Sequence, residues 1–369
     1  MNKLARYIIM AVVVTLVAFT AWYFSNILTY VIISVVLSIL GKPLVRALDR
    51  LPVRRCRLSR TAAAAAVLLG MWGVCIACFY FLLPAVVDLV NQLSNINIDQ
   101  ALSDMGHWLD AMQAWLIAYV PGVDASFSLR GAIADELTSI FDQTAVLTMF
   151  GSVTNTLISF IVGAFAVSFI TFFFLKEEDL FTQGVLLLFP DRHEAHASAA
   201  LTSVNQLLSR YFIGLAIDMC CMATLVTTGL TLIAGLPFQV AIVLGALAGV
   251  LNVIPYIGAI ASSLTGVVIG VLMSIDGTML SAGVVPVMIK MASVYIGAQA
   301  LDAAVMQPFI FSKSVRSHPL EIFLVILIAG SIGGIIGMLV AIPAYTVLRV
   351  FAKQFFNQFK VVQRLTKTI

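Results

Sequence analysis

The stretch L-N-V-I-P-Y-I-G at residues 251–258 lies in the middle of an almost entirely apolar run, residues 238–273. A proline lacks a backbone donor and obstructs the carbonyl one turn earlier, so Pro255 interrupts a helix here. Asn252 and Gly258 flank the break. At membrane depth, interrupted backbone is tolerated only inside protein or beside water, and transporters place such breaks beside their substrates. The stretch therefore predicts a discontinuous membrane helix at a translocation site.

The composition places the chain in a membrane. Of its 369 residues, 61% are hydrophobic and 11% are charged, and the mean hydropathy is +1.05. Several apolar runs reach the roughly 20 residues that a spanning helix needs, and they do not alternate as barrel strands do. We expect an all-α, polytopic helical membrane protein of about eight transmembrane spans. Discontinuous helices are expected in its C-terminal half, and a small helical segment outside the membrane.

Charged residues are sorted along the chain. Residues 41–60 carry seven Lys or Arg and one Asp, whereas residues 84–148 carry eight acidic residues and one Arg. By the positive-inside rule, the first segment is a cytoplasmic loop, and the second is then extracytoplasmic. Lys3, Arg6 and the basic residues after 348 predict that the N- and C-termini are cytoplasmic.

Hydropathy divides the chain into six segments. Residues 1–83 are predicted to hold three spans. The first two are short helices joined by a turn near Ser25 and Asn26, and the third ends at Pro84. The other predicted segments are an extracytoplasmic helical segment at 84–148, a fourth span at 149–176, a cytoplasmic amphipathic helix at 177–210, a transport core at 211–350 and a basic cytoplasmic tail at 351–369.

A second long apolar run, residues 319–350, is interrupted like the first. Each run is either one broken span or a re-entrant pair of helices, and the choice decides which side Asp276 and Lys313 face. Glycines at small-x-x-x-small spacing favour close helix contact, within or between subunits, although they also fit a loosened, flexible helix. The run is interrupted by Gly330, Gly333, Gly334 and Gly337 and then by Pro343, and the spaced glycine pairs are 330 with 334 and 333 with 337.

Ionisable side chains inside apolar runs are costly unless they are paired or hydrated. Asp218 and Lys290 each lie inside a predicted span and fit either a structural ion pair or a proton-coupling or cation site. Asp302 and His318 mark a less apolar stretch near Gln299. His318 precedes a proline, so it fits either a group that titrates near neutral pH or a helix cap.

No arrangement of residues predicts catalysis. His193 and His196 are three residues apart but lack a third ligand, so no metal site is expected. The chain has no G-x-x-x-x-G-K-[ST] nucleotide loop. We therefore expect neither enzymatic activity nor a cofactor nor a nucleic-acid partner.

Three motifs resemble the AI-2E family of bacterial permeases, the autoinducer-2 exporter-like proteins. They are N-V-I-P-Y-I-G at 252–258, L-D-A-A-V-M-Q-P-F-I-F-S-K-S-V-R-S-H-P-L at 301–320 and G-S-I-G-G-I-I-G-M-L-V-A-I-P at 330–343. The resemblance covers nearly the whole chain. It implies an eight-span, homo-oligomeric protein of the bacterial cytoplasmic (inner) membrane, in a family linked both to autoinducer-2 export and to sodium or lithium/proton antiport.

The residues and the resemblance together predict three groups of functional residues. The substrate pathway is expected to include Asn252, Pro255, Tyr256, Gly258, Gln299, Asp302, Pro308, His318 and Pro319. Ion coupling is assigned to Asp218, Lys290 and Asp302, and helix packing to Gly330, Gly333, Gly334, Gly337 and Pro343. Two departures from the family's usual pattern, Ala303 where many relatives have Asn and Glu321 where an aliphatic residue is more usual, bear on the choice of substrate.

Two hypotheses share this architecture. The first is a secondary transporter that exports a small polar solute such as autoinducer-2. The second is a monovalent cation (sodium or lithium)/proton antiporter. The expected partners are a small-molecule or ion cargo, the lipid bilayer and further copies of the chain. A non-transporting scaffold would instead have an intact bundle without a water-accessible cavity at Asn252.

Overall fold

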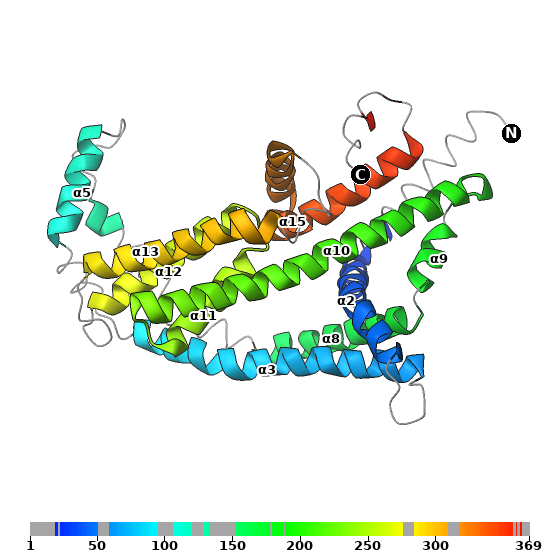
Figure 1. The fold of residues 1–369 in the computed structure, drawn as a ribbon, viewed down its shortest axis with the longest axis horizontal. Helices are drawn as coiled ribbons and strands as arrows, with labels where there is room; N and C mark the ends of the chain where they lie inside the picture. Colours follow the sequence, from blue (N-terminus) through cyan, green and yellow to red (C-terminus); the bar gives the residue numbers. More distant parts are fainter. Residues whose placement is uncertain are drawn as a thin grey trace. The chain divides into compact units, whose positions relative to one another are not determined.

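The computed structural model describes residues 19–20, 23–50, 59–94, 106–119, 128–132, 153–177, 179–187, 189–275, 284–308, 318–356, 359 and 362–363. Every regular element in these ranges is a helix (Figure 1). The chain divides into two compact units. The first unit comprises residues 1–74, 154–212 and 350–363, and the second comprises residues 75–153, 213–349 and 364–369.

The described helices follow one another along the chain. In order they are α2 (Ser25–Arg50), α3 (Arg60–Ser94), α5 (Gly106–Tyr119), α8 (Val153–Lys176), α9 (Leu180–Leu186), α10 (Asp191–Gly229), the π-helix η1 (Leu230–Ala234), α11 (Phe238–Leu251), α12 (Ile257–Ile275), α13 (Val284–Leu301), the π-helix η2 (Asp302–Met306) and α15 (Pro319–Phe355).

Six of the described helices are long and apolar enough to span a membrane, and a seventh span is formed if α8 and α9, bent by 92°, count as one. The prediction of an all-α polytopic membrane protein is confirmed. The predicted eight spans included residues 4–24, most of which lie outside the described ranges, as do Asp276 and Lys313.

Several helices run beyond the boundaries that hydropathy predicted. The helix α2 continues to Arg50, so the first ten residues of the predicted loop at 41–60 are helical. Pro84 does not end α3, which continues to Ser94. The helix α10 is continuous from Asp191 to Gly229 and passes through the boundary predicted at residue 211. Hydropathy locates the membrane, but a helix with satisfied backbone hydrogen bonds continues into water, and membrane helices tolerate a proline.

In the first unit, small side chains allow α2, α3 and α8 to pack closely. The fully buried Ala63 and Ala64 of α3 lie in one apolar cluster with Val45 of α2 and Leu175 of α8. A Cβ atom on Gly41 of α2 would crowd the side chain of Leu175, so the close approach depends on glycine there. The short side chains of the five alanines at 62–66 suit this contact, because small residues let membrane helices approach closely.

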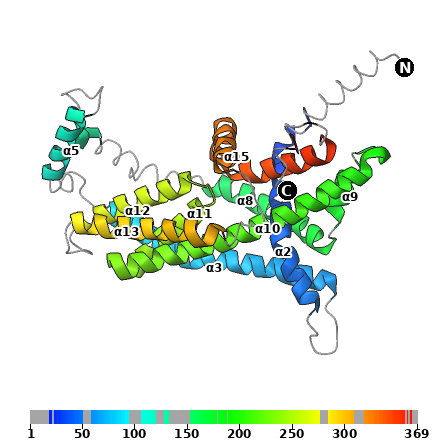
Figure 2. The ribbon, with the colours of Figure 1, turned by 45° about the horizontal axis from the view of Figure 1, so that its top comes forward.

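In the second unit, α10 and η1 together present every fourth residue to the main apolar core, where Met222 and Val226 of α10 and Leu230 of η1 are fully buried. The helix α11 packs antiparallel to α10, since Gly245 faces Thr227 and Gly249 faces Met219. The helices α12 and α13 also pack antiparallel and lie side by side in Figures 1 and 2.

Both interrupted apolar runs are pairs of helices rather than single spans. The first is a helical hairpin, because α11 and α12 are joined by five residues and pack against each other. Within α15, Gly334 has φ 58° and ψ −142°, which is not helical. The chain turns so sharply there that Gly337 lies against Ala329 and Gly330 against Met338. Near the two ends of this pair, Glu321 and Arg349 interact electrostatically.

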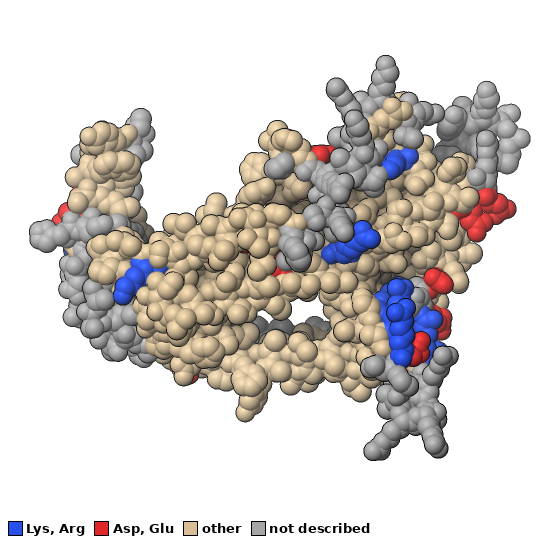
Figure 3. Space-filling model, in the orientation of Figure 1, with Lys and Arg blue, Asp and Glu red and all other residues tan. Residues whose placement is uncertain are grey.

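In Figure 3 most of the surface over α10 and α13 is uncharged, with isolated Lys or Arg patches over both helices. Lys and Arg side chains gather near α2, with acidic neighbours. The low density of charge suits helices that face lipid.

Candidate functional site

The break between α11 and α12 is built from three residues with different roles. Pro255 has no backbone N–H, and Tyr256 has a left-handed conformation with φ 66°. A Cβ atom on Gly258 would overlap the carbonyl oxygen of Leu251, so only glycine fits there. The Gly258 N–H then donates to the Ile254 carbonyl at 2.9 Å, and α12 begins. The predicted break is therefore a tight turn.

Asn252 caps the C-terminal end of α11 and brings two acidic side chains together. Its Nδ2 donates to Oδ2 of Asp218 at 2.9 Å and lies 3.5 Å from Oδ2 of Asp302. The two partners are 34 and 50 residues away in the sequence. One amide at the helix break thus joins α10, α11 and η2.

Asp218 lies on the buried face of α10, one turn before Met222, and is 2% exposed. The apolar stripe of that helix therefore ends in a carboxyl group turned toward the helix break. This position differs from the predicted pairing: no ion pair joins Asp218 to Lys290 in the described part of the chain, and Lys290 is exposed on α13.

Asp302 begins the π-helical turn that follows α13 and is fully buried. Nε2 of Gln307 donates to its Oδ2 at 2.8 Å. Gln307 is five residues further on, a separation that the wider π-turn brings onto one face. Single π-turns occur frequently at functional sites.

Each of the two carboxyl groups has an oxygen atom without a hydrogen bond. Oδ1 of Asp218 and Oδ1 of Asp302 are both buried and have no hydrogen-bonding partner among the described residues. The Asn252 amide lies between the two carboxyl groups. Buried charged or polar groups are costly when unpaired, so this cluster is suited to accept hydrogen bonds from a solute or to hold a proton or a cationic group.

A groove between α12 and α13 lies one helical turn from Asp302. It is open to solvent, has a volume of about 970 Å³ and is mainly apolar, with Tyr295 and Gln299 among its lining residues. The Tyr295 hydroxyl and the Gln299 Nε2 are buried and have no hydrogen-bonding partner among the described residues. Tyr295 and Gln299 of α13 and Asp302 at the start of η2 therefore present polar groups at helical spacing.

The remaining predicted pathway residues lie apart from this cluster's hydrogen bonds. Tyr256 is exposed and packs edge-on against Phe323, with ring centroids 5.9 Å apart. Pro308 is exposed after η2. His318 is exposed and accepts a hydrogen bond at Nδ1 from the Leu320 N–H at 3.3 Å, which is the helix-capping alternative. Pro319 is the first residue of α15.

The residues assigned to packing divide into two groups. Gly330 and Gly337 permit the close approach on either side of the turn in α15. Gly333 and Gly334 have open space where a Cβ would lie, so they take no part in close contact. Pro343 does not interrupt α15, contrary to the prediction, because the break is at Gly334 instead.

Two residues of the site were not assigned from the sequence. Gln307 follows Asp302 at a spacing of five, which does not face a common side in an α-helix. Tyr295 has the appearance of an ordinary core aromatic residue, and only its unpartnered hydroxyl distinguishes it.

Comparisons with known proteins identify the family of the chain. The sequence profile described as AI-2E family transporter matches residues 8–357. The chain is 28% identical to the candidate transport protein YueF of Bacillus subtilis (strain 168) over 279 residues, which are 75% of this chain and 69% of YueF. It is 30% identical to the candidate transport protein YrrI of the same organism over 204 residues, 55% of this chain and 54% of YrrI. It is 40% identical to the candidate permease PerM of Escherichia coli (strain K12) over 57 residues, 15% of this chain and 16% of PerM. The profile match extends over nearly the whole chain, and the protein belongs to the AI-2E family of transporters.

Proposed function

We propose that this membrane protein is a secondary transporter of the bacterial inner membrane that exports a small polar solute, such as autoinducer-2. The observation that carries the proposal is the cluster at the break between α11 and α12, where Asn252 joins the buried carboxyl groups of Asp218 and Asp302. Buried ionisable groups inside membrane helices are expensive, and helix breaks at that depth place polar groups beside a substrate.

The donors and acceptors suit a solute that carries several hydroxyl groups. The unpartnered Oδ1 atoms of Asp218 and Asp302 accept hydrogen bonds from hydroxyl groups. In the groove nearby, Gln299 Nε2 offers a donor, and the Tyr295 hydroxyl both donates and accepts. A site with buried polar groups selects solutes that satisfy them, because an analogue without hydroxyl groups leaves these atoms unpaired.

The second hypothesis, exchange of sodium or lithium for protons, receives no support from the comparisons. The names of the relatives refer to transport or to a permease and mention no cation. The predicted ion-coupling residue Lys290 is exposed on α13. Flux measurements in proteoliposomes test cation–proton exchange as well.

Purified protein in proteoliposomes tests the proposal, with a pH-sensitive dye inside and autoinducer-2, sodium, lithium or potassium added in turn. We expect autoinducer-2 flux, and we expect Asp302→Asn to lower it by roughly 10- to 100-fold, since a hydrogen bond to a charged group contributes about 1.5–3 kcal/mol. The matched control is Asp110→Asn on α5, where the side chain is exposed.

The outcomes separate the hypotheses. Autoinducer-2 flux that is unaffected by Asp302→Asn would place the binding site elsewhere. Dye movement on adding a cation, lost in Asp302→Asn, would replace solute export with cation–proton exchange. Flux of neither kind with correctly folded protein would contradict both.

A further inference from the structure

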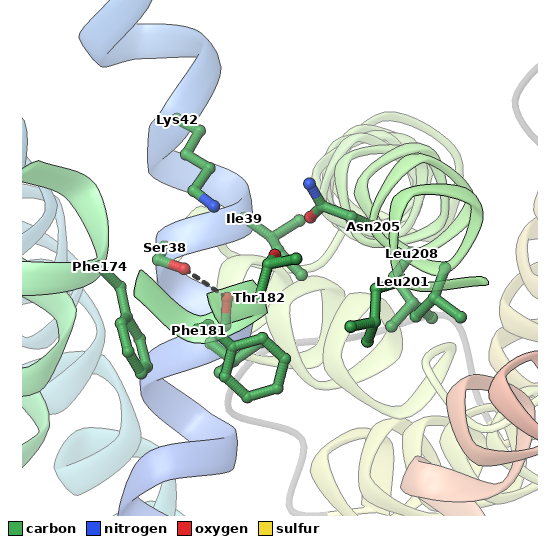
Figure 4. Close-up of a pocket in the computed structure, with 11 residues that line it drawn as sticks. Ser38, Ile39, Lys42, Phe174, Phe181, Thr182, Leu201, Asn205 and Leu208 are labelled. Atoms are coloured by element: carbon green, nitrogen blue, oxygen red, sulfur yellow. Dashed lines mark hydrogen bonds between the residues drawn. The ribbon is translucent and has the colours of Figure 1, made fainter. Parts of the chain in front are cut away.

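A pair of adjoining hollows in the first unit is separate from the transport cluster. The first is an apolar hollow of about 500 Å³, part of it open to solvent, between α2, α8, α9 and α10 (Figure 4). The second is a polar hollow of about 860 Å³ between α2 and α10. Lys42 and Asn205 line both, so the two spaces meet at these residues.

The polar hollow is built to receive negative charge. Its walls include three basic side chains, Lys42 and Arg46 from α2 and Arg210 from α10. The other lining residues offer hydroxyl or amide groups, except for Pro43, and none of the described lining residues is acidic. Lys42 and Arg46 are four residues apart and therefore share one face of α2.

The apolar hollow continues from the basic end. Figure 4 shows Lys42 and Asn205 at one end and the rings of Phe174 and Phe181 at the other. Leu201, Val204 and Leu208 of α10 complete this lining at three- and four-residue spacing. The apolar side of the amphipathic helix predicted at 177–210 therefore lies along the wall of this hollow.

We infer that these hollows bind an anionic phospholipid, with its phosphate headgroup among Lys42, Arg46 and Arg210 and an acyl chain in the apolar hollow. Basic pockets between membrane helices on the cytoplasmic side are suited to such headgroups. Residues 41–60 are expected on that side because of their excess of Lys and Arg. A soluble phosphate compound would use only the basic half of the site.

The test is native mass spectrometry of the full chain in detergent, titrated with phosphatidylglycerol or with phosphatidylcholine of the same acyl chains. We expect tighter binding of phosphatidylglycerol. Lys42→Gln and Arg46→Gln should each reduce this preference about fivefold, the usual effect of one basic residue near an anionic lipid. Arg210→Gln tests the opposite wall of the same hollow.

The matched control is Arg50→Gln, which removes the same charge from the same helix at an exposed position that lines neither hollow. An equal loss in Arg50→Gln would mean a general surface-charge effect and overturn the inference. Equal binding of the two lipids by the unaltered protein would also overturn it. Deacylated headgroup, glycerophosphoglycerol, should fail to displace the lipid at equal concentration, and efficient displacement would show that the apolar hollow is unused.

Discussion

At the residue scale, the site depends on single polar atoms around two buried carboxyl groups. Asn252 supplies one amide to two carboxyl groups, and Gln307 supplies a second donor to Asp302. Removing one partner of a buried hydrogen bond leaves the other unsatisfied, at a cost of about 1–3 kcal/mol. The cluster therefore resists substitution, although each of its hydrogen bonds alone contributes little net stability.

Gly258→Ala tests the turn that positions Asn252. Because a Cβ would overlap the Leu251 carbonyl oxygen, we expect a loss of about 1–3 kcal/mol in the free energy of unfolding and a fall in transport. Thermal unfolding in detergent, followed by tryptophan fluorescence, measures the first. Gly297→Ala is the control, since α13 has open space there. Equal melting temperatures for the two variants would contradict the proposed role of Gly258.

At the element scale, two helical hairpins replace two apparent spans. The five residues between α11 and α12 reverse one chain segment, and a single glycine reverses the other. The arms α11 and the first half of α15 are shorter than the roughly 20 residues of a span. Paired short helices thus bring broken backbone into the protein interior, where neighbouring groups satisfy it.

Gly334→Ala tests the turn in α15. A side chain at φ 58° and ψ −142° is strained, so we expect a loss of about 1–3 kcal/mol in stability. The adjacent Gly333→Ala is the control, because Gly333 has open space and an ordinary backbone conformation. Denaturation of both variants in the same detergent gives the comparison. If Gly333→Ala were the more harmful change, the turn would not depend on the conformation of Gly334.

At the scale of the whole molecule, the sorted charges predict how the chain crosses the membrane. We expect α5 outside the cytoplasm and the N-terminal part of α10 inside it. With the five native cysteines replaced, Ala111→Cys should react with a membrane-impermeant maleimide in intact cells, and Ala195→Cys only after the membrane is permeabilised. Both positions are exposed, so accessibility reports the side of the membrane. Labelling in the reverse pattern would invert the topology.

Local sequence signals predicted much of this architecture. The apolar runs predicted the membrane helices. Proline and glycine predicted the break at residues 252–258 and the interruption near Gly334, because each of these residues alters the backbone within a few positions of itself. Helix ends were predicted less well: Pro84 and residue 211 do not end helices, since hydropathy records the membrane and not the end of the backbone hydrogen bonds.

The sequence by itself determined that this chain is a helical membrane protein of the AI-2E family with broken helices in its C-terminal half. Only the tertiary structure decided which polar residues meet. Asp218 lies with Asn252 and Asp302 rather than with Lys290, because α10, α11 and η2 pack across separations of 34 and 50 residues. Gln307 joins them because a π-turn changes the register, and helical spacing in a sequence reveals neither long-range packing nor such a change.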